Sequence, residues 1–188
     1  MITRLHKYWI WLILSLPAGV MLWRYATDAI TYGQVVHESG QWSAAALVLA
    51  LAVTPLRALL GNVGLVRWLL RQRRALGVAS FAYAALHTLV YLERKAELAR
   101  IVKEAQNPDL IAGWLALIIF VPLAITSNNL SVRRLGKNWK RLHRSAYLAT
   151  ALLFVHWLLA TVNTLAAWLT LALIIILETL RIARRKKV

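Results

Sequence analysis

The 188 residues are 60% hydrophobic, include nine tryptophans and carry a net charge of +16. Few soluble domains have this composition, and several apolar stretches approach the ~20 residues needed to cross a bilayer, so we expect an integral membrane protein. The basic residues lie between the hydrophobic segments, which is the pattern of membrane orientation and argues against a nucleic-acid partner. The absence of cysteine excludes disulfides, iron–sulfur clusters and covalent c-type haem attachment.

Hydrophobicity predicts an all-α protein with six transmembrane helices. In chain order they span about residues 8–25, 42–60, 75–92, 110–126, 142–162 and 165–182. We expect a loop over residues 26–41 and a short helix lying in the membrane interface within Gly61–Arg74. Residues Glu93–Asp109 predict a short amphipathic helix that is broken at Asn107-Pro108.

The distribution of charge predicts the orientation of this bundle. Of the 23 Lys and Arg residues, 18 lie at the two termini and in the loops after the second and fourth helices. The positive-inside rule therefore places both termini in the cytoplasm. Six of the seven acidic residues fall on the opposite side, with Glu178 as the exception. The two halves show no obvious sequence repeat, and we expect residues 1–188 to form one transmembrane domain.

Two histidines lie inside predicted membrane helices. His87 and His156 are about 18 and 21 Å from the cytoplasmic ends of their helices, at a rise of ~1.5 Å per residue. An imidazole at such a depth is a functional-site candidate, and two at one depth on parallel helices suit bis-histidine ligation of one haem. Structural hydrogen bonding and a proton or ion path are the alternatives. A proton relay usually includes buried carboxylates, and the predicted core offers only Glu178.

Further candidates lie at the cytoplasmic edge. A second bis-histidine haem would need a histidine 13 or 14 residues before His87, where Arg74 and Arg73 stand, so the sequence supports one complete pair. Arg73, Arg74 and His143 are candidates for binding an anionic group, such as a haem propionate, a flavin phosphate or a lipid headgroup. An interfacial, solvated role is the alternative for His143, and solvated positions are expected for His6 and His37.

Several short motifs occur in order along the chain. They are Thr54-Pro55-Leu56-Arg57, Arg73-Arg74-Ala75-Leu76-Gly77, His87, Leu135-Gly136-Lys137-Asn138-Trp139, Leu142-His143, Tyr147 and His156. Taken together, these motifs resemble the MsrQ (YedZ) family of haem-binding membrane subunits. More distantly they are similar to the ferric-reductase-like membrane domain shared with NADPH oxidases and metalloreductases. The resemblance extends from about His37 to the C-terminus, and the first ~35 residues match only in hydrophobicity.

The resemblance implies a six-helix electron conduit in the bacterial inner membrane, with haem b and FMN. In that family, electrons come from the quinone pool or a cytoplasmic flavin reductase. They pass to MsrP, a periplasmic molybdopterin enzyme that repairs oxidised methionine, so this chain would be an electron-transfer subunit and not the catalytic one. Carried over by motif, His87 and His156 are the haem ligands, and His143 is a further ligand or a residue of an inner site.

The sequence also limits the source of electrons. It has no GxGxxG loop for a dinucleotide, so electrons must come from a lipid-soluble carrier or a separate protein. The basic inner loops suit an acidic donor or anionic lipid. Two other functions stay open: a membrane ferric or oxygen reductase that acts directly through haem, and a transporter or scaffold without redox chemistry.

Overall fold

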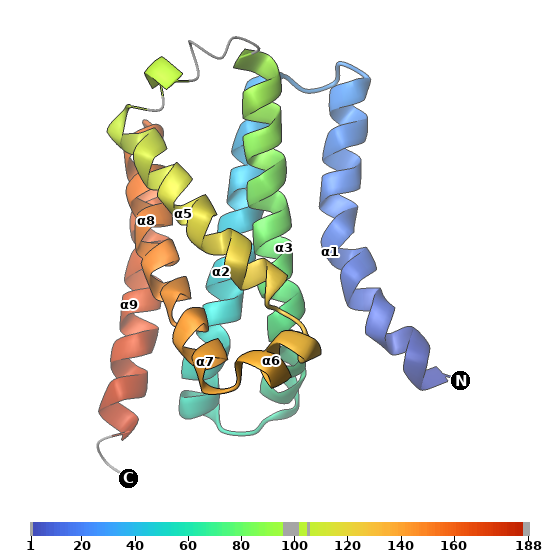
Figure 1. Cartoon of the computed structure of the whole chain (residues 1–188), viewed down its shortest axis with the longest axis vertical. Coiled ribbons are helices and arrows are strands. Elements are labelled where there is room, and N and C mark those ends of the chain that lie inside the picture. The colour runs from blue at the N-terminus through green and yellow to red at the C-terminus, as the bar shows by residue number, and fades with distance from the viewer. Residues whose placement is uncertain (1, 96–101, 105, 186–188) are drawn as a thin grey trace. The chain divides into compact units, whose positions relative to one another are not determined.

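The computed structural model describes residues 2–95, 102–104 and 106–185, and in this part of the chain every regular element is a helix (Figure 1). The chain divides into two compact units, Met1–Ala96 and Glu97–Val188, and each is described by itself. The first contains α1 (Ile2–Ala26), α2 (Tyr32–Leu60) and α3 (Gly64–Lys95). The second contains α5 (Pro108–Ile125), α6 (Asn129–Leu135), α7 (Lys137–His143), α8 (Ser145–Ala160) and α9 (Leu165–Arg185).

The antiparallel pair α2 and α3 forms the core of the first unit (Figure 1). A tight turn at Gly61, whose φ of 71° favours glycine, joins the two helices. Small side chains let the backbones approach closely, as is usual between membrane helices. Among them, the Ser43 hydroxyl donates to the Ser80 carbonyl across the interface at 2.9 Å. This close packing fixes which residues of α2 face which residues of α3.

Helix α1 packs more loosely and bends part-way along its length (Figure 1). Pro17 lies inside this helix, where its ring removes one backbone donor. The Tyr83 hydroxyl, from α3, donates to the Leu14 carbonyl at 2.7 Å and accepts from the Ala18 amide at 3.2 Å. It thus bridges the two backbone groups that an uninterrupted helix joins directly, and a group inserted in this way is a known cause of bends.

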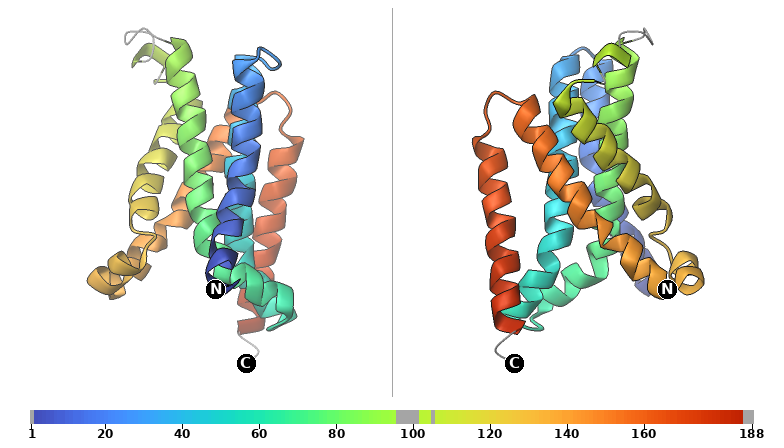
Figure 2. Two further views of the ribbon diagram at one scale, coloured as in Figure 1. Left: turned by 90° about the vertical axis from the view of Figure 1, so that its right-hand side faces the viewer. Right: turned by 60° about the vertical axis from the view of Figure 1, so that its left-hand side comes forward.

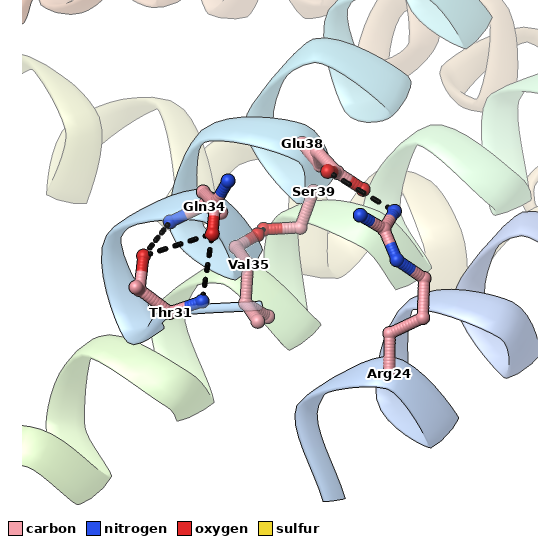
Figure 3. Close-up of polar contacts among 6 residues, drawn as sticks. All are labelled: Arg24, Thr31, Gln34, Val35, Glu38 and Ser39. Carbon is pink, nitrogen blue, oxygen red and sulfur yellow. Dashed lines mark hydrogen bonds and ion pairs between the residues drawn. The ribbon is translucent and has the colours of Figure 1, made fainter. Parts of the chain in front are cut away.

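The start of α2 corrects the predicted loop over residues 26–41, which is wrong from Tyr32 onward. Figure 3 shows the cause: the Gln34 amide donates to the Thr31 hydroxyl, and the Gln34 side chain accepts from the Thr31 amide at 2.7 Å. This capping box satisfies amides that the first turn would otherwise leave unpaired. An Arg24–Glu38 ion pair of 3.5 Å links α1 to a later turn of α2.

The segment Gly61–Arg74 also differs from the prediction. Only residues up to Val63 are non-helical, and the expected separate interfacial helix is the N-terminal part of α3. Figure 2 shows the first turns of α3 running at an angle to the rest of the helix. The predicted helix within Glu93–Asp109 falls largely on residues 96–101 and 105, outside the described part, but the break at Asn107-Pro108 is confirmed because α5 begins at Pro108.

In the second unit, α5 packs along α8, and α6 and α7 connect them. Asn128 caps α6 by accepting from the Ser131 amide at 2.8 Å, and Gly136, with a φ of 50°, separates α6 from α7. Near its C-terminal end, α9 is joined to α8 by Arg181, which donates to Glu178 at 2.7 Å and to the Tyr147 hydroxyl at 3.2 Å. Glu178, the acidic residue of the last predicted helix, is thus paired with the cationic Arg181.

Among the described residues, five helices are long and apolar enough to cross a membrane, namely Tyr8–Ala26 of α1, α2, Gly64–Arg94 of α3, α5 and Leu165–Arg184 of α9. Large apolar side chains such as Trp9, Trp23 and Leu169 are more than half exposed, as suits contact with lipid. This confirms an all-α, multi-pass membrane protein. Helix α8 has 16 residues and spans about 24 Å, short of the ~30 Å hydrocarbon core, so the count of six spans and the orientation stay predictions.

Candidate functional site

His87 lies against the N-terminal part of α2. Its Nδ1 is 2.8 Å from the Val36 carbonyl oxygen, and the ring is partly buried. The ring also lies over Gly40: a Cβ added to that glycine would be 3.3 Å from Nδ1 and 3.5 Å from Cε1. Val36 follows the first turn of α2, which begins at the capping box of Thr31 and Gln34.

His156, in the second unit, has the same kind of environment. Its Nδ1 is 2.7 Å from the Asp109 carbonyl oxygen in the first turn of α5. The ring lies over Gly113, where an added Cβ would be 3.0 Å from Nδ1, 3.2 Å from Cε1 and 3.3 Å from Cγ. In both units, therefore, a histidine near the end of one helix bonds to a carbonyl four residues before a glycine of the neighbouring helix.

The similarity extends along the packed faces. Buried residues of α2 and α5 fall at the same four positions relative to Gly40 and Gly113, respectively. These positions are one residue before the glycine and three, seven and ten residues after it. They are Ser39, Ser43, Leu47 and Ala50 in α2, and Ala112, Ala116, Phe120 and Leu123 in α5. The residue seven before each histidine, Ser80 or Ala149, is buried as well. The α2–α3 and α5–α8 pairs thus share one packing pattern, which the sequence does not reveal because the residue types differ.

The hydrogen bond to a backbone carbonyl determines the tautomer of His87 and of His156. A carbonyl oxygen only accepts, so Nδ1 of His87 and of His156 is the protonated nitrogen. In the neutral imidazole the lone pair then belongs to Nε2, the nitrogen that binds a metal when Nδ1 donates to the protein. Both rings are therefore held in the tautomer that suits a metal ligand bound through Nε2.

His143 is held differently, on α7. Its ring stacks on Trp139 with centroids 3.9 Å apart and planes at 23°, and its Nε2 is 3.0 Å from the Thr126 hydroxyl. Thr126 donates that hydroxyl to the Pro122 carbonyl at 2.6 Å, so it accepts from His143. Here Nε2 carries the proton and Nδ1 the lone pair, the reverse of His87 and His156.

The remaining predicted residues lie elsewhere. Arg73 and Arg74 are exposed on α3, about 20 Å along the helix from His87, so the structure does not bring them to that ring. His37 is solvent-exposed as predicted, but it belongs to α2 and not to a loop. The side chain of His6 lies outside the described residues.

Sequence reasoning missed the two carbonyls and the two glycines. A backbone acceptor carries no residue-type signal, so Val36 and Asp109 were not visible as partners. The glycines gave a weak signal: a glycine inside an apolar helix costs stability and often has a packing or functional reason. Gly40 and Gly113 both fit that description.

Comparison with known proteins identifies the family. Residues 39–154 match the family model described as "Ferric reductase like transmembrane component". The chain belongs to this family. It is 38% identical over 157 residues to the protein-methionine-sulfoxide reductase heme-binding subunit MsrQ of Ralstonia nicotianae, covering 79% of this chain and 70% of that protein. It is 41% identical over 127 residues to the same-named subunit of Brucella ovis, covering 66% of this chain and only 56% of that relative.

The ferric-reductase-like match includes His87, His143 and both glycines, and ends two residues before His156. It also includes a basic surface on α6 and α7. That surface consists of the exposed side chains of Arg133, Arg134, Lys137, Lys140 and Arg141. Its charge favours contact with anionic groups, whether of lipid or of a protein.

Proposed function

We propose that this chain is the haem-binding membrane subunit of a protein-methionine-sulfoxide reductase system, and that His87 and His156 are the residues that would hold haem b. One observation carries the proposal: each ring donates Nδ1–H to a helix carbonyl, at 2.8 and 2.7 Å, so that Nε2 holds the lone pair. The names of the relatives support the choice of ligand, since they describe heme-binding subunits.

The residues present fit this group. The cysteine-free chain offers imidazole nitrogen as its strongest iron donor, and each ring lies over a glycine, which has no Cβ to displace the ring. Bound haem iron supplies one-electron uptake and release. The Val36 and Asp109 carbonyls keep the rings oriented, so that Nε2 would be the nitrogen that donates to the iron.

The finer parts of the proposal concern position and partners. We propose one transmembrane domain in the bacterial inner membrane, with six spans including α8 and with both termini in the cytoplasm. Electrons would enter from the quinone pool or a cytoplasmic flavin reductase and leave to an MsrP-like periplasmic enzyme. The basic surface of α6 and α7 would contact an acidic donor or anionic lipid. Arg73 and Arg74 would bind an anionic group. FMN binding is proposed on the family resemblance.

The first test is a visible spectrum of the detergent-purified protein, oxidised and then reduced with dithionite. We expect the sharp reduced α-band of six-coordinate b-haem, with iron near one per chain. His87→Ala and His156→Ala should each lose most of the haem, while His37→Ala, which alters an exposed histidine of α2, should keep it. Full haem retention in either of the first two variants would contradict the ligand assignment.

The amount of iron also tests His143. A value near two per chain would require a second site, and His143 would then bind through Nδ1, because Nε2 bonds to Thr126. No Soret band after expression with ample haem would contradict the redox function and leave a transporter or scaffold as the alternative. FMN binding would be tested by denaturing the pure protein and measuring the flavin that it releases.

A second candidate is direct ferric reduction, which the description of the matching family model favours. The two functions differ in the acceptor. The reduced protein would be mixed in turn with a ferric chelate and with the oxidised partner reductase. Reoxidation of the haem would be measured by its absorbance. Faster reoxidation by the partner reductase supports the proposed function, and faster reoxidation by the chelate supports ferric reduction.

A further inference from the structure

Two helical glycines make contacts that the others do not. A Cβ on Gly40 or Gly113 would meet a side chain at 3.3 and 3.0 Å, closer than ordinary van der Waals contact, and in both cases the side chain is a histidine ring. At the other helical glycines of the described chain, Gly19, Gly33, Gly64 and Gly77, an added Cβ would meet nothing within 4 Å. Close contact at a glycine therefore occurs only at His87 and His156 within the described residues.

Glycine is a costly residue at these positions. It loses more backbone freedom on folding than alanine and is a poorer helix former. Neither Gly40 nor Gly113 has a positive φ, so the backbone itself does not require glycine. The contact with the imidazole supplies the reason: only a bare Cα lets the ring lie close enough to reach the carbonyl of the preceding turn.

We propose that Gly40 and Gly113 are positioning residues that hold the His87 and His156 rings in the Nδ1–H tautomer, with Nε2 presented as the metal-binding nitrogen. The ligand role of the rings rests on the proposed function, but the tautomer and the ring position do not. The carbonyls of Val36 and Asp109 have two lone pairs. In a regular helix one accepts the amide of the glycine four residues on, and the other is available to the imidazole.

The geometry predicts what a methyl group would do. At 3.3 Å the His87 ring must shift by a few tenths of an ångström, and at 3.0 Å the His156 ring must shift further. Each shift lengthens the Nδ1–H···O bond and makes Nε2 a weaker donor. The oxidised iron is then less stabilised, so the reduction potential rises, and the effect is larger for Gly113→Ala than for Gly40→Ala.

The experiment compares Gly40→Ala and Gly113→Ala with Gly33→Ala in α2 and Gly77→Ala in α3, where an added methyl group meets nothing. Electron paramagnetic resonance of the ferric protein reports the ligand orientation, and a redox titration reports the potential. We expect the first two variants to shift the g values, raise the potential and release haem about tenfold faster, the low end of outer-shell effects on metal affinity. The two control variants should match the unsubstituted protein.

A second readout needs no haem. In haem-free protein labelled with 15N-histidine, NMR distinguishes Nδ1–H from Nε2–H, and His→Gln variants assign the signals. We expect Nδ1–H at His87 and His156, with Nε2–H gaining population in the corresponding glycine variant. An Nε2–H tautomer at either ring in the unsubstituted protein would overturn the inference, even if an alanine variant failed to fold.

The two proposals fail in different ways. Haem retained in His87→Ala or His156→Ala would contradict the ligand assignment alone. Haem lost in those variants, together with unchanged spectra in Gly40→Ala and Gly113→Ala, would overturn the positioning role alone. Equal shifts in the control variants would overturn it too, because the effect would then come from alanine in the helix and not from the ring.

Discussion

Thr126 is the residue that ties α7 to the end of α5. Its hydroxyl accepts from His143 Nε2 at 3.0 Å and donates to the Pro122 carbonyl, and its own carbonyl accepts from the Trp139 indole at 2.9 Å. Thr126→Val keeps nearly the same volume but removes the hydroxyl. We expect a loss of about 0.5–1.5 kcal/mol in the free energy of unfolding, measured by thermal unfolding in detergent, with full haem content.

Thr170→Val is the matched control. The Thr170 hydroxyl is exposed and donates to Ala166 of its own helix at 2.7 Å, so its removal should change the free energy of unfolding less. Equal losses in both variants would mean that the His143 contact contributes nothing measurable. A loss of haem in Thr126→Val would instead indicate that His143 belongs to a haem site.

Residue-level predictions from the sequence depend on residue type. His87 and His156 are candidates because imidazole is rare in apolar helices, and their role as ligands stays a prediction. Their partners were not found, because the acceptors are backbone carbonyls at Val36 and Asp109. Glu178 illustrates the same limit: its position was evident, but its pairing with Arg181 depends on side-chain directions on α9 that hydrophobicity does not report.

At the scale of elements, the bend in α1 depends on a residue of another helix. Tyr83→Phe removes the hydroxyl that bridges Leu14 and Ala18, so that the helical bond between these two residues can close. We expect α1 to straighten. The chain has no cysteine, so spin labels at Tyr8→Cys and Trp23→Cys, both on exposed positions of α1, report the change as a longer distance between the labels.

Tyr25→Phe serves as the control, because Tyr25 packs against the same apolar cluster as Tyr83. This variant should leave the distance between the labels unchanged. An unchanged distance in Tyr83→Phe as well would mean that Pro17 alone causes the bend.

Helix boundaries were predicted less well than helix positions. The start of α2 was placed ten residues late because Gly33, Gly40 and the polar residues between them have loop-like composition. The correct signal was local: Thr31 followed three residues later by Gln34 is a capping-box pattern. The extent of α3 could not be predicted from hydrophobicity, because its arginine-rich first turns and its apolar remainder have different compositions but form one continuous helix.

At the scale of the whole molecule, the number of spans depends on α8. Its 16 residues span about 24 Å, which crosses a ~30 Å core only if the bilayer thins or flanking residues complete the span. The charge distribution favours a full crossing. With six spans the basic residues at both chain ends lie in the cytoplasm, whereas with five the C-terminal cluster would be translocated against the positive-inside rule.

Single cysteines distinguish these topologies, since the natural chain has none. Asn163→Cys lies between α8 and α9, and Lys137→Cys lies in α7, before α8; both positions are exposed. A maleimide that does not cross membranes would be applied to intact spheroplasts and again after permeabilisation. We expect Asn163→Cys to react in intact cells and Lys137→Cys only after permeabilisation, because α8 separates them.

Asp28→Cys and Asn62→Cys calibrate the two sides, because each lies beside helices that are long enough to span. We expect Asp28→Cys to react from outside and Asn62→Cys only after permeabilisation. If Asn163→Cys instead behaved like Lys137→Cys, α8 would enter and leave on one side. His156 lies four residues before the end of α8, so a full crossing would bring it close to the outer surface. This topology would place His156 on the side of the proposed periplasmic acceptor, and the labelling of Asn163→Cys therefore tests a requirement of the proposed function as well as the fold.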